Sequence, residues 1–197
     1  MSKGETTREH IIAQAAALFN SRGFAGAPLS ELMKITGLQK GGIYNHFNNK
    51  EEILIAAFRY SVKVLLQKVQ NVTAHEKTPR GMLKAIIEFY RDYPLNPVIK
   101  GGCPILNAMV DSDNTNPVLR KHVQAAIEEL IRRLQVIVAA AIHKGEFKKD
   151  VDAREAAIII FTTIEGGVAL SRNYEDNHFM ETMIDFLHQY VDQTLSR

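Results

Sequence analysis

The chain has 197 residues, of which 46% are hydrophobic and 23% are charged. This composition excludes a disordered chain and suits one domain of ordinary size, or a small domain joined to a larger one. The single cysteine, Cys103, excludes an intrachain disulfide and favours a reducing compartment. The polar N-terminus has no signal-peptide pattern, and no apolar stretch reaches membrane-spanning length. We therefore expect a cytoplasmic protein with no membrane partner.

Charge is unevenly distributed along the chain, although the net charge is only +2. Residues 1–50 carry six Lys and Arg against three Asp and Glu, a net charge of +3, and the remaining residues have a net charge of −1. A basic N-terminal segment suits a module that contacts phosphates. The imbalance is small and adds little by itself.

Hydrophobic residues recur at helical spacing, and no segment alternates as a strand would. The first four helices are expected at about 11–22, 28–36, 39–47 and 49–73, where Gly23 and Gly37 end the first two and Asn49 caps the fourth. Five more are expected at about 78–92, 103–110, 117–144, 151–172 and 180–195. The sequence therefore predicts an all-α protein of about nine helices.

The strongest functional pattern is the pair of short helices around Gly37. Two short helices joined by a tight glycine turn form the unit that lays its second helix in the major groove of DNA. Ile43 and Phe47, four residues apart, would fix one side of that helix to the helices behind it. The other side would present small or polar residues, namely Gln39, Lys40, Gly41, Gly42, Tyr44, Asn45 and His46.

Two consecutive glycines, Gly41 and Gly42, lie in the middle of this expected helix. Each costs about 1 kcal/mol relative to alanine in a helix. That cost is understandable if the backbone must come close to DNA. The alternative is that the pair forms a loop, and the residues alone leave both readings open.

Residues 6 to about 60 are similar to the DNA-binding domain of TetR-family transcriptional regulators, also called the TetR/AcrR family. The resemblance rests on Gly23-Phe24 after the first helix and on the run Gly37-Leu38-Gln39-Lys40-Gly41-Gly42-Ile43-Tyr44-Asn45-His46-Phe47-Asn48-Asn49-Lys50-Glu51-Glu52. It implies a three-helix DNA-binding domain at 6–66, with the helix-turn-helix at about 28–47. A C-terminal helical domain at 67–197 would bind a ligand and form a dimer.

The resemblance also implies how single residues meet DNA. Base edges would be contacted by Lys40, Gly41 and Tyr44, and phosphates by the Gly42 backbone, Tyr44, Asn45, His46 and Lys50. Alternatives stay open at three positions: Lys40 could bind only a phosphate, His46 could cap the recognition helix, and Lys50 could be an ordinary solvated lysine.

The start of the second helix departs from the family pattern. The family usually has Thr or Ser there, whereas this chain has Ala27-Pro28-Leu29. Ser30 could supply the missing hydroxyl contact to a phosphate. The cap of this helix and its DNA contact are therefore the least secure part of the resemblance.

For the C-terminal domain, the resemblance implies a dimer interface and a ligand cavity. The interface would comprise Ile159, Ile160, Thr163, Gly166, Gly167, Ala169, Met183, Leu187 and Tyr190, with the glycines allowing a partner helix to approach closely. The cavity would be lined by Phe89, Tyr90, Tyr93, Cys103, Leu106, Met109, Phe161, Ile164 and Glu165, each of which could instead be ordinary core.

The segment Gly101-Gly102-Cys103-Pro104 resembles a TetR subgroup with a Gly-Cys-Pro start to the sixth helix. Cys103 could sense oxidants or electrophiles if its thiolate were stabilised at the helix N-terminus. The other reading is a small buried residue at the start of a helix.

Together these features predict a sequence-specific transcriptional regulator that binds a palindromic double-stranded operator as a homodimer. Most of the family are repressors released by a small-molecule effector, unknown here, and a bacterial nucleoid would be the place of the DNA-bound form. The alternatives are a helical small-molecule-binding protein that has lost operator binding, and a ligand-dependent activator. An enzyme is not expected, nor a cofactor or metal, because catalytic motifs are lacking and His75, His122, His143, His178 and His188 have no metal-ligand spacing.

Overall fold

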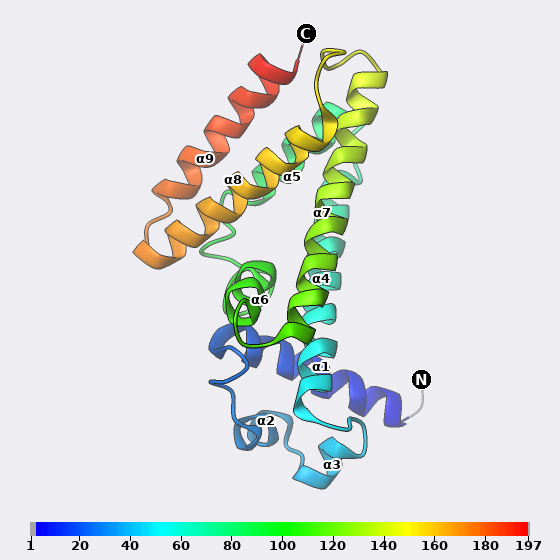
Figure 1. Ribbon diagram of the computed structural model, residues 1–197, viewed down its shortest axis with the longest axis vertical. Coiled ribbons are helices and arrows are strands. Elements are labelled where there is room, and N and C mark those ends of the chain that lie inside the picture. The colour runs from blue at the N-terminus through cyan, green and yellow to red at the C-terminus, as the bar shows by residue number, and fades with distance from the viewer. Residues whose placement is uncertain (1–2, 197) are drawn as a thin grey trace. The chain divides into compact units, whose positions relative to one another are not determined.

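The computed structural model describes residues 3–196, and this part of the chain is all α, which confirms the predicted fold class. A single isolated bridge joins Phe147 to Ser196. The described residues form nine α-helices and a terminal π-helix (Figure 1): α1 (Lys3–Arg22), α2 (Leu29–Thr36), α3 (Lys40–Tyr44), α4 (Lys50–Thr73), α5 (Pro79–Phe89), α6 (Pro104–Ser112), α7 (Pro117–His143), α8 (Ala153–Tyr174), α9 (His178–Gln189) and η1 (Tyr190–Leu195).

The described chain divides into two compact units. The first contains residues 3–65 and Val98–Val123, and the second contains Leu66–Pro97 and residues 124–196. The change of unit within α4 falls between Leu65 and Leu66. The sequence did not predict that α6 and the start of α7 join the first unit.

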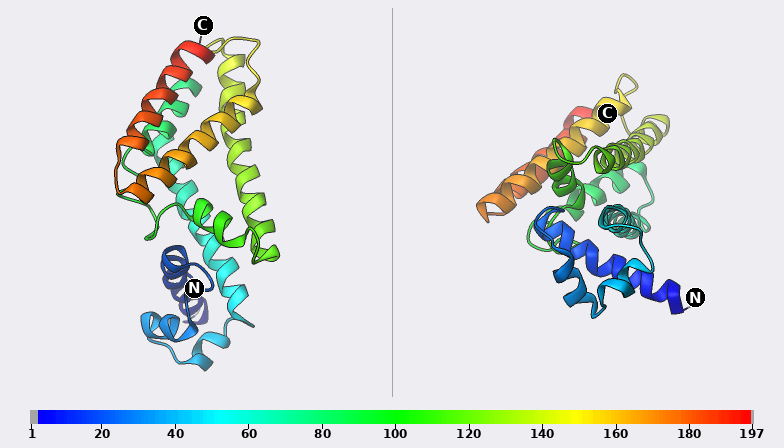
Figure 2. Two further views of the ribbon diagram at one scale, coloured as in Figure 1. Left: turned by 60° about the vertical axis from the view of Figure 1, so that its left-hand side comes forward. Right: turned by 60° about the horizontal axis from the view of Figure 1, so that its bottom comes forward.

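The helix-turn-helix is formed by α2 and α3, which lie close to α1 (Figure 2). Gly37 ends α2 in the left-handed conformation, with φ of 70°, which glycine adopts without strain. The third helix was predicted to reach residue 47, but α3 ends at Tyr44 because the next turn tightens. There the His46 amide donates to the Ile43 carbonyl, three residues back, at 3.0 Å.

The predicted cap of α4 is confirmed. The Asn49 side-chain oxygen accepts from the Glu52 amide at 2.8 Å, which satisfies one of the free N–H groups of the first turn. The Glu52 carboxylate in turn accepts from the Asn48 amide at 2.8 Å. These two bonds fix the point at which the chain leaves α3 and enters α4.

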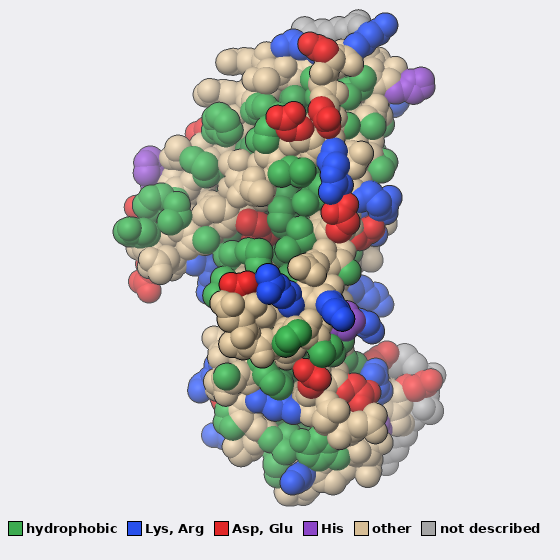
Figure 3. Space-filling view, in the orientation of Figure 1, with side chains coloured by type: hydrophobic (Ala, Val, Ile, Leu, Met, Phe, Trp, Pro, Cys, Tyr) green, Lys and Arg blue, Asp and Glu red, His purple; other side chains and the backbone are tan. Residues whose placement is uncertain are grey.

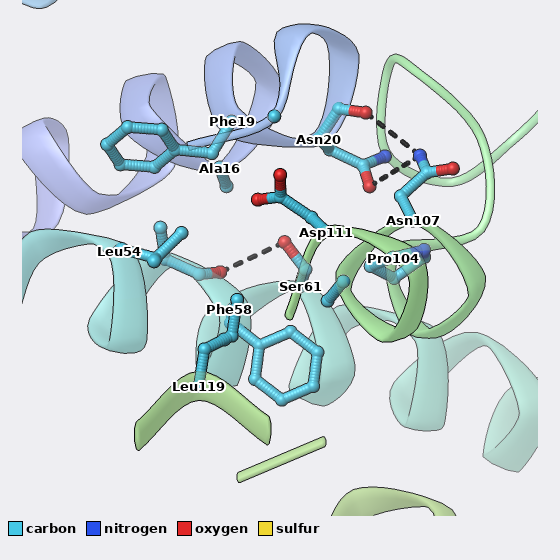
Figure 4. Close-up of a pocket in the computed structure, with 13 residues that line it drawn as sticks. Ala16, Phe19, Asn20, Leu54, Phe58, Ser61, Pro104, Asn107, Asp111 and Leu119 are labelled. Carbon is cyan, nitrogen blue, oxygen red and sulfur yellow. Dashed lines mark hydrogen bonds between the residues drawn. The ribbon is translucent and has the colours of Figure 1, made fainter. Parts of the chain in front are cut away.

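Within the first unit, the segment before α6 packs tightly on the end of α1. The Asn20 side-chain amide donates to the carbonyls of Lys100 and Gly102 at 3.1 and 2.9 Å. The Asn107 amide donates to the Asn20 carbonyl and side-chain oxygen at 2.9 and 3.0 Å (Figure 4). Gly101 has φ of 106°, and a Cβ there would lie 2.6 Å from the Asn20 backbone. We call this contact the α1–α6 seam.

In the second unit, α8 and α9 lie side by side (Figure 1). Gly167 allows this approach, because a Cβ at that position would lie 2.9 Å from the sulfur of Met180 on α9. Two predicted helix starts are also seen here. Thr78 caps α5 by accepting from the Gly81 amide at 3.0 Å, and Asp152 caps α8 by accepting from Arg154 and Glu155.

We predict that Gly101→Ala destabilises the protein by about 2–4 kcal/mol, because the added methyl group meets backbone atoms that cannot move aside and φ is positive. Urea unfolding measures this loss. Gly41→Ala is the control, since a Cβ there meets nothing within 4 Å and should leave stability unchanged or higher. Equal midpoints for Gly101→Ala and the wild type would contradict the tight seam.

Candidate nucleic-acid interface

The helix α3 is fixed on one side and open on the other, as the sequence predicted. Ile43 is fully buried and Phe47 is 2% exposed, so both belong to the core of the first unit. Gln39, Lys40, Gly41 and Asn45 are exposed, and Gly42, Tyr44 and His46 are partly exposed. The result is a small, polar surface on a helix whose position is set by burial of its opposite side.

The glycine pair lies within α3 and is not a loop. The two glycines have different surroundings. A Cβ on Gly42 would rest against the Leu38 side chain at 3.6 Å, whereas a Cβ on Gly41 would meet nothing within 4 Å. Gly41 therefore leaves bare backbone on the open face, where another molecule can approach closely.

The start of α2 shows the departure from the family pattern that the sequence indicated. Pro28 occupies the cap position and no side chain bonds to the first amides of the helix. Ser30 lies inside the first turn and is exposed. Its hydroxyl is therefore accessible to solvent but does not replace the missing cap.

Lys50 is engaged within the protein. Its ammonium donates to the Phe24 carbonyl oxygen at 2.7 Å and lies 4.3 Å from the centre of the Phe24 ring. Burial lowers the pKa of Lys50, and the carboxylate of Asp111 opposes this shift. The predicted phosphate contact would require the ammonium to leave these partners, so the structure favours a role in holding the turn between α1 and α2.

The same turn is held from the other side by α6. The Phe24 amide donates to the Asp111 carboxylate at 2.9 Å, and Asp111 also lies beside Gly23. Asp111 borders a small cavity of about 40 Å³ in the first unit (Figure 4). The sequence did not single out Asp111, because its partner Phe24 lies 87 residues away in the chain.

The second unit contains a cavity of about 380 Å³, a size typical of sites for small molecules. Four of the predicted ligand-binding residues line it: Tyr90, Phe161, Ile164 and Glu165. The sequence prediction did not include the rest of the wall, which comes from the end of α4, from α5 and from α7. Its residues are Leu66, Val69, Gln70, Thr73, Ile86, Leu130, Arg132, Arg133, Leu134, Val136 and Ile137.

The other predicted ligand residues lie elsewhere. Phe89 and Tyr93 pack against Tyr90, with ring centroids 5.0 and 5.1 Å from it. Cys103, Leu106 and Met109 belong to the first unit and do not line the cavity of the second. Cys103 is fully buried at the start of α6, which favours the structural reading of this cysteine over the sensor.

The predicted dimer residues divide into buried and accessible groups. Ile160, Gly167 and Leu187 are buried within the chain and are therefore not available to a partner, and Gly167 faces α9 of its own chain. Ile159, Thr163, Ala169, Met183 and Tyr190 are partly exposed, and Gly166 is exposed.

An open apolar surface runs along α8 and α9. Ile158, Thr162, Gly166 and Leu170 follow one another at four-residue intervals on α8 and are all exposed. On α9, Phe186 is 49% exposed and stacks on Tyr190. Hydrophobic side chains are visible near the turn between these helices (Figure 3). Of the predicted dimer residues on α8, only Gly166 lies on this exposed row.

Comparison with known proteins decides the family. A family profile described as "Bacterial regulatory proteins, tetR family" matches residues 11–57, and one described as "Tetracyclin repressor-like, C-terminal domain" matches residues 79–187. The second match covers more than half of the chain. This protein belongs to the TetR family.

Similar proteins support the assignment over the full length. A TetR regulator from Chloroflexus aurantiacus J-10-FL is 40% identical, with 100% of this chain and 99% of that chain covered and a TM-score of 0.95. A TetR-family regulator from Cytophaga hutchinsonii is 29% identical, with 100% and 98% covered and a TM-score of 0.92. The regulator TtgR of Pseudomonas putida is 25% identical, with 83% and 79% covered.

The protein is thus a helix-turn-helix transcriptional regulator of the TetR family, in which ligand-responsive repression is the usual role. Regulators of this family bind operator DNA, act as homodimers and respond to small-molecule effectors. Among residues 3–196, no helix is long and apolar enough to cross a membrane, and no cluster of three or more metal-ligating side chains occurs.

We predict that Lys50→Met lowers the free energy of unfolding of this TetR-family protein by about 1–2 kcal/mol, because the Phe24 carbonyl loses a charged donor and its ring loses a cation. Thermal unfolding measures the loss. Lys40→Met removes the same charge from an exposed site and should change stability by less than about 0.5 kcal/mol. If Lys50→Met lowered the free energy of unfolding no more than Lys40→Met does, Lys50 would be an ordinary surface lysine.

Proposed function

We propose that this protein is a homodimeric repressor that reads a palindromic operator through α3 and releases it when a small molecule occupies the cavity of the second unit. The observation that carries the DNA-binding part is the construction of α3. Its buried side, Ile43 and Phe47, fixes the helix, and its open side exposes the bare backbone of Gly41. A major groove is wide enough to admit an α-helix, and a position without a side chain lets the helix backbone approach the DNA closely.

The proposed contacts on DNA follow the exposure of the side chains. Lys40, Gly41 and Tyr44 would meet base edges, and Gln39 extends the same surface. Ser30, Gly42, Asn45 and His46 would meet phosphates, which position the protein without reading sequence. Lys50 would support the interface from within through its bond to Phe24.

Dimerisation is proposed through the open surface of α8 and α9, because two recognition helices are needed to read both halves of a palindrome. We assign the DNA contacts to residues 6–66, and ligand binding and dimerisation to 67–197, of which residues 98–123 pack in the first unit and support the DNA-binding helices. Repression is proposed over activation because it is the usual role in the family. No catalytic activity or cofactor is proposed, and the cytoplasm and the nucleoid are the proposed locations.

A first test uses Gly41→Leu. The side chain enters open space in a helix, so folding should be unaffected, and it occupies the space proposed for DNA, so operator affinity should fall about 100-fold or more. Fluorescence anisotropy on DNA from upstream of the protein's own gene, across a salt series, gives the affinity. Wild-type binding without steep salt dependence or sequence preference would refute operator binding, and full affinity of Gly41→Leu would refute the placement of α3.

A second test uses Gly166→Leu, which likewise adds a side chain where nothing lies within 4 Å. If α8 meets a partner there, the variant should stay folded and shift from dimer to monomer, with dimer affinity reduced about 100-fold. Analytical ultracentrifugation measures the change, and Gly41→Leu, a dimer by this proposal, is the matched control. A Gly166→Leu dimer as tight as the wild type would place the interface elsewhere.

A further inference from the structure

The cavity of the second unit combines an apolar wall with a deeply buried carboxyl group. Leucine, isoleucine and valine side chains from α4, α5, α7 and α8 make up most of its lining. Glu165 on α8 reaches the same cavity and is only 7% exposed. A carboxylate removed from water is stabilised by a nearby positive charge far more than one on the surface.

Two aromatic rings line the cavity together with this carboxyl group. Phe161 precedes Glu165 by four residues on α8, so both project from the same face of the helix. Tyr90, directly after α5, supplies the second ring. The face of an aromatic ring attracts cations, as does a carboxylate, so three of the groups that line this cavity favour the same charge.

Arg132 and Arg133 also line the cavity, and they could favour an anion instead. Both guanidinium groups, however, bind Glu129, with Nε–O distances of 2.8 and 2.7 Å. These bonds lower the pKa of Glu129 to about 2, so the ion pairs persist at neutral pH. The arginine side chains are 57% and 47% exposed, and solvent screens such charges, whereas Glu165 is shielded from it.

We propose that this cavity binds an apolar monocation, a molecule with a hydrocarbon or aromatic body and one ammonium group. Its body occupies the apolar wall, and its charge lies beside Glu165 and the rings of Tyr90 and Phe161. The inference rests on the proposed function in taking this cavity as the effector site, and it adds the chemical class of the effector.

Isothermal titration calorimetry with three matched probes tests the proposal. Each probe carries a phenylbutyl body, and the head group is trimethylammonium, the neutral isostere tert-butyl, or carboxylate. The wild-type protein should bind the ammonium probe about tenfold or more tightly than the tert-butyl probe, because only the charge differs. Glu165→Gln should bring this ratio close to one, whereas Glu181→Gln, which removes an exposed carboxylate on α9, should leave it unchanged.

Three results with the wild-type protein would overturn the proposal. They are equal affinity for the ammonium and tert-butyl probes, highest affinity for the carboxylate probe, and no binding of any probe. These results need no variant, so a misfolded Glu165→Gln protein would not obscure them. The calorimetry contains no DNA, so its result does not depend on whether the protein represses transcription. If the ammonium probe binds through Glu165 but leaves the operator complex intact, the ligand class stands and release by this ligand fails.

Discussion

The α1–α6 seam is the contact on which the first unit depends. The Asn20 side-chain amide donates to backbone carbonyls in the segment before α6, and the Asn107 side-chain amide donates to the backbone carbonyl of Asn20. Gly101 lets the two backbones meet without an intervening side chain. Buried or half-buried amide groups of this kind are stabilising only when all partners are in place. The seam therefore defines one position of α6 on α1.

From this seam a chain of contacts leads to the DNA-binding surface within the same unit. Asp111 on α6 holds the Phe24 amide, and Lys50 at the start of α4 holds the Phe24 carbonyl. Both backbone groups of Phe24, its amide and its carbonyl, are thus hydrogen-bonded, which holds the turn between α1 and α2. The orientation of α2 and α3 follows from that turn, so groups far from the open face of α3 take part in positioning it.

Local sequence was sufficient to predict that the helices exist, although not the end of α3, and to predict the Asn49 cap and the open face of α3, since each depends on residues within a few positions of one another. It was insufficient wherever the neighbour comes from a distant segment. Gly167 faces α9 of its own chain and not a partner, Lys50 bonds to Phe24, and Cys103 lies in a different unit from the cavity. Spacing indicates which residues share a face, but not which other helix that face meets. For the same reason the apolar side chains of α4 and α7 that line the cavity could not be told apart from ordinary core.

Native-state hydrogen exchange in increasing urea tests most directly whether α6 belongs with the DNA-binding helices. The account predicts that the amides of α6 open at the same free energy, and with the same urea dependence, as those of α1 and the buried part of α3. Both should lose protection together in Gly101→Ala. Opening of α6 together with α5 and α8, independently of α1, would contradict the claim that the seam makes α6 part of the DNA-binding unit.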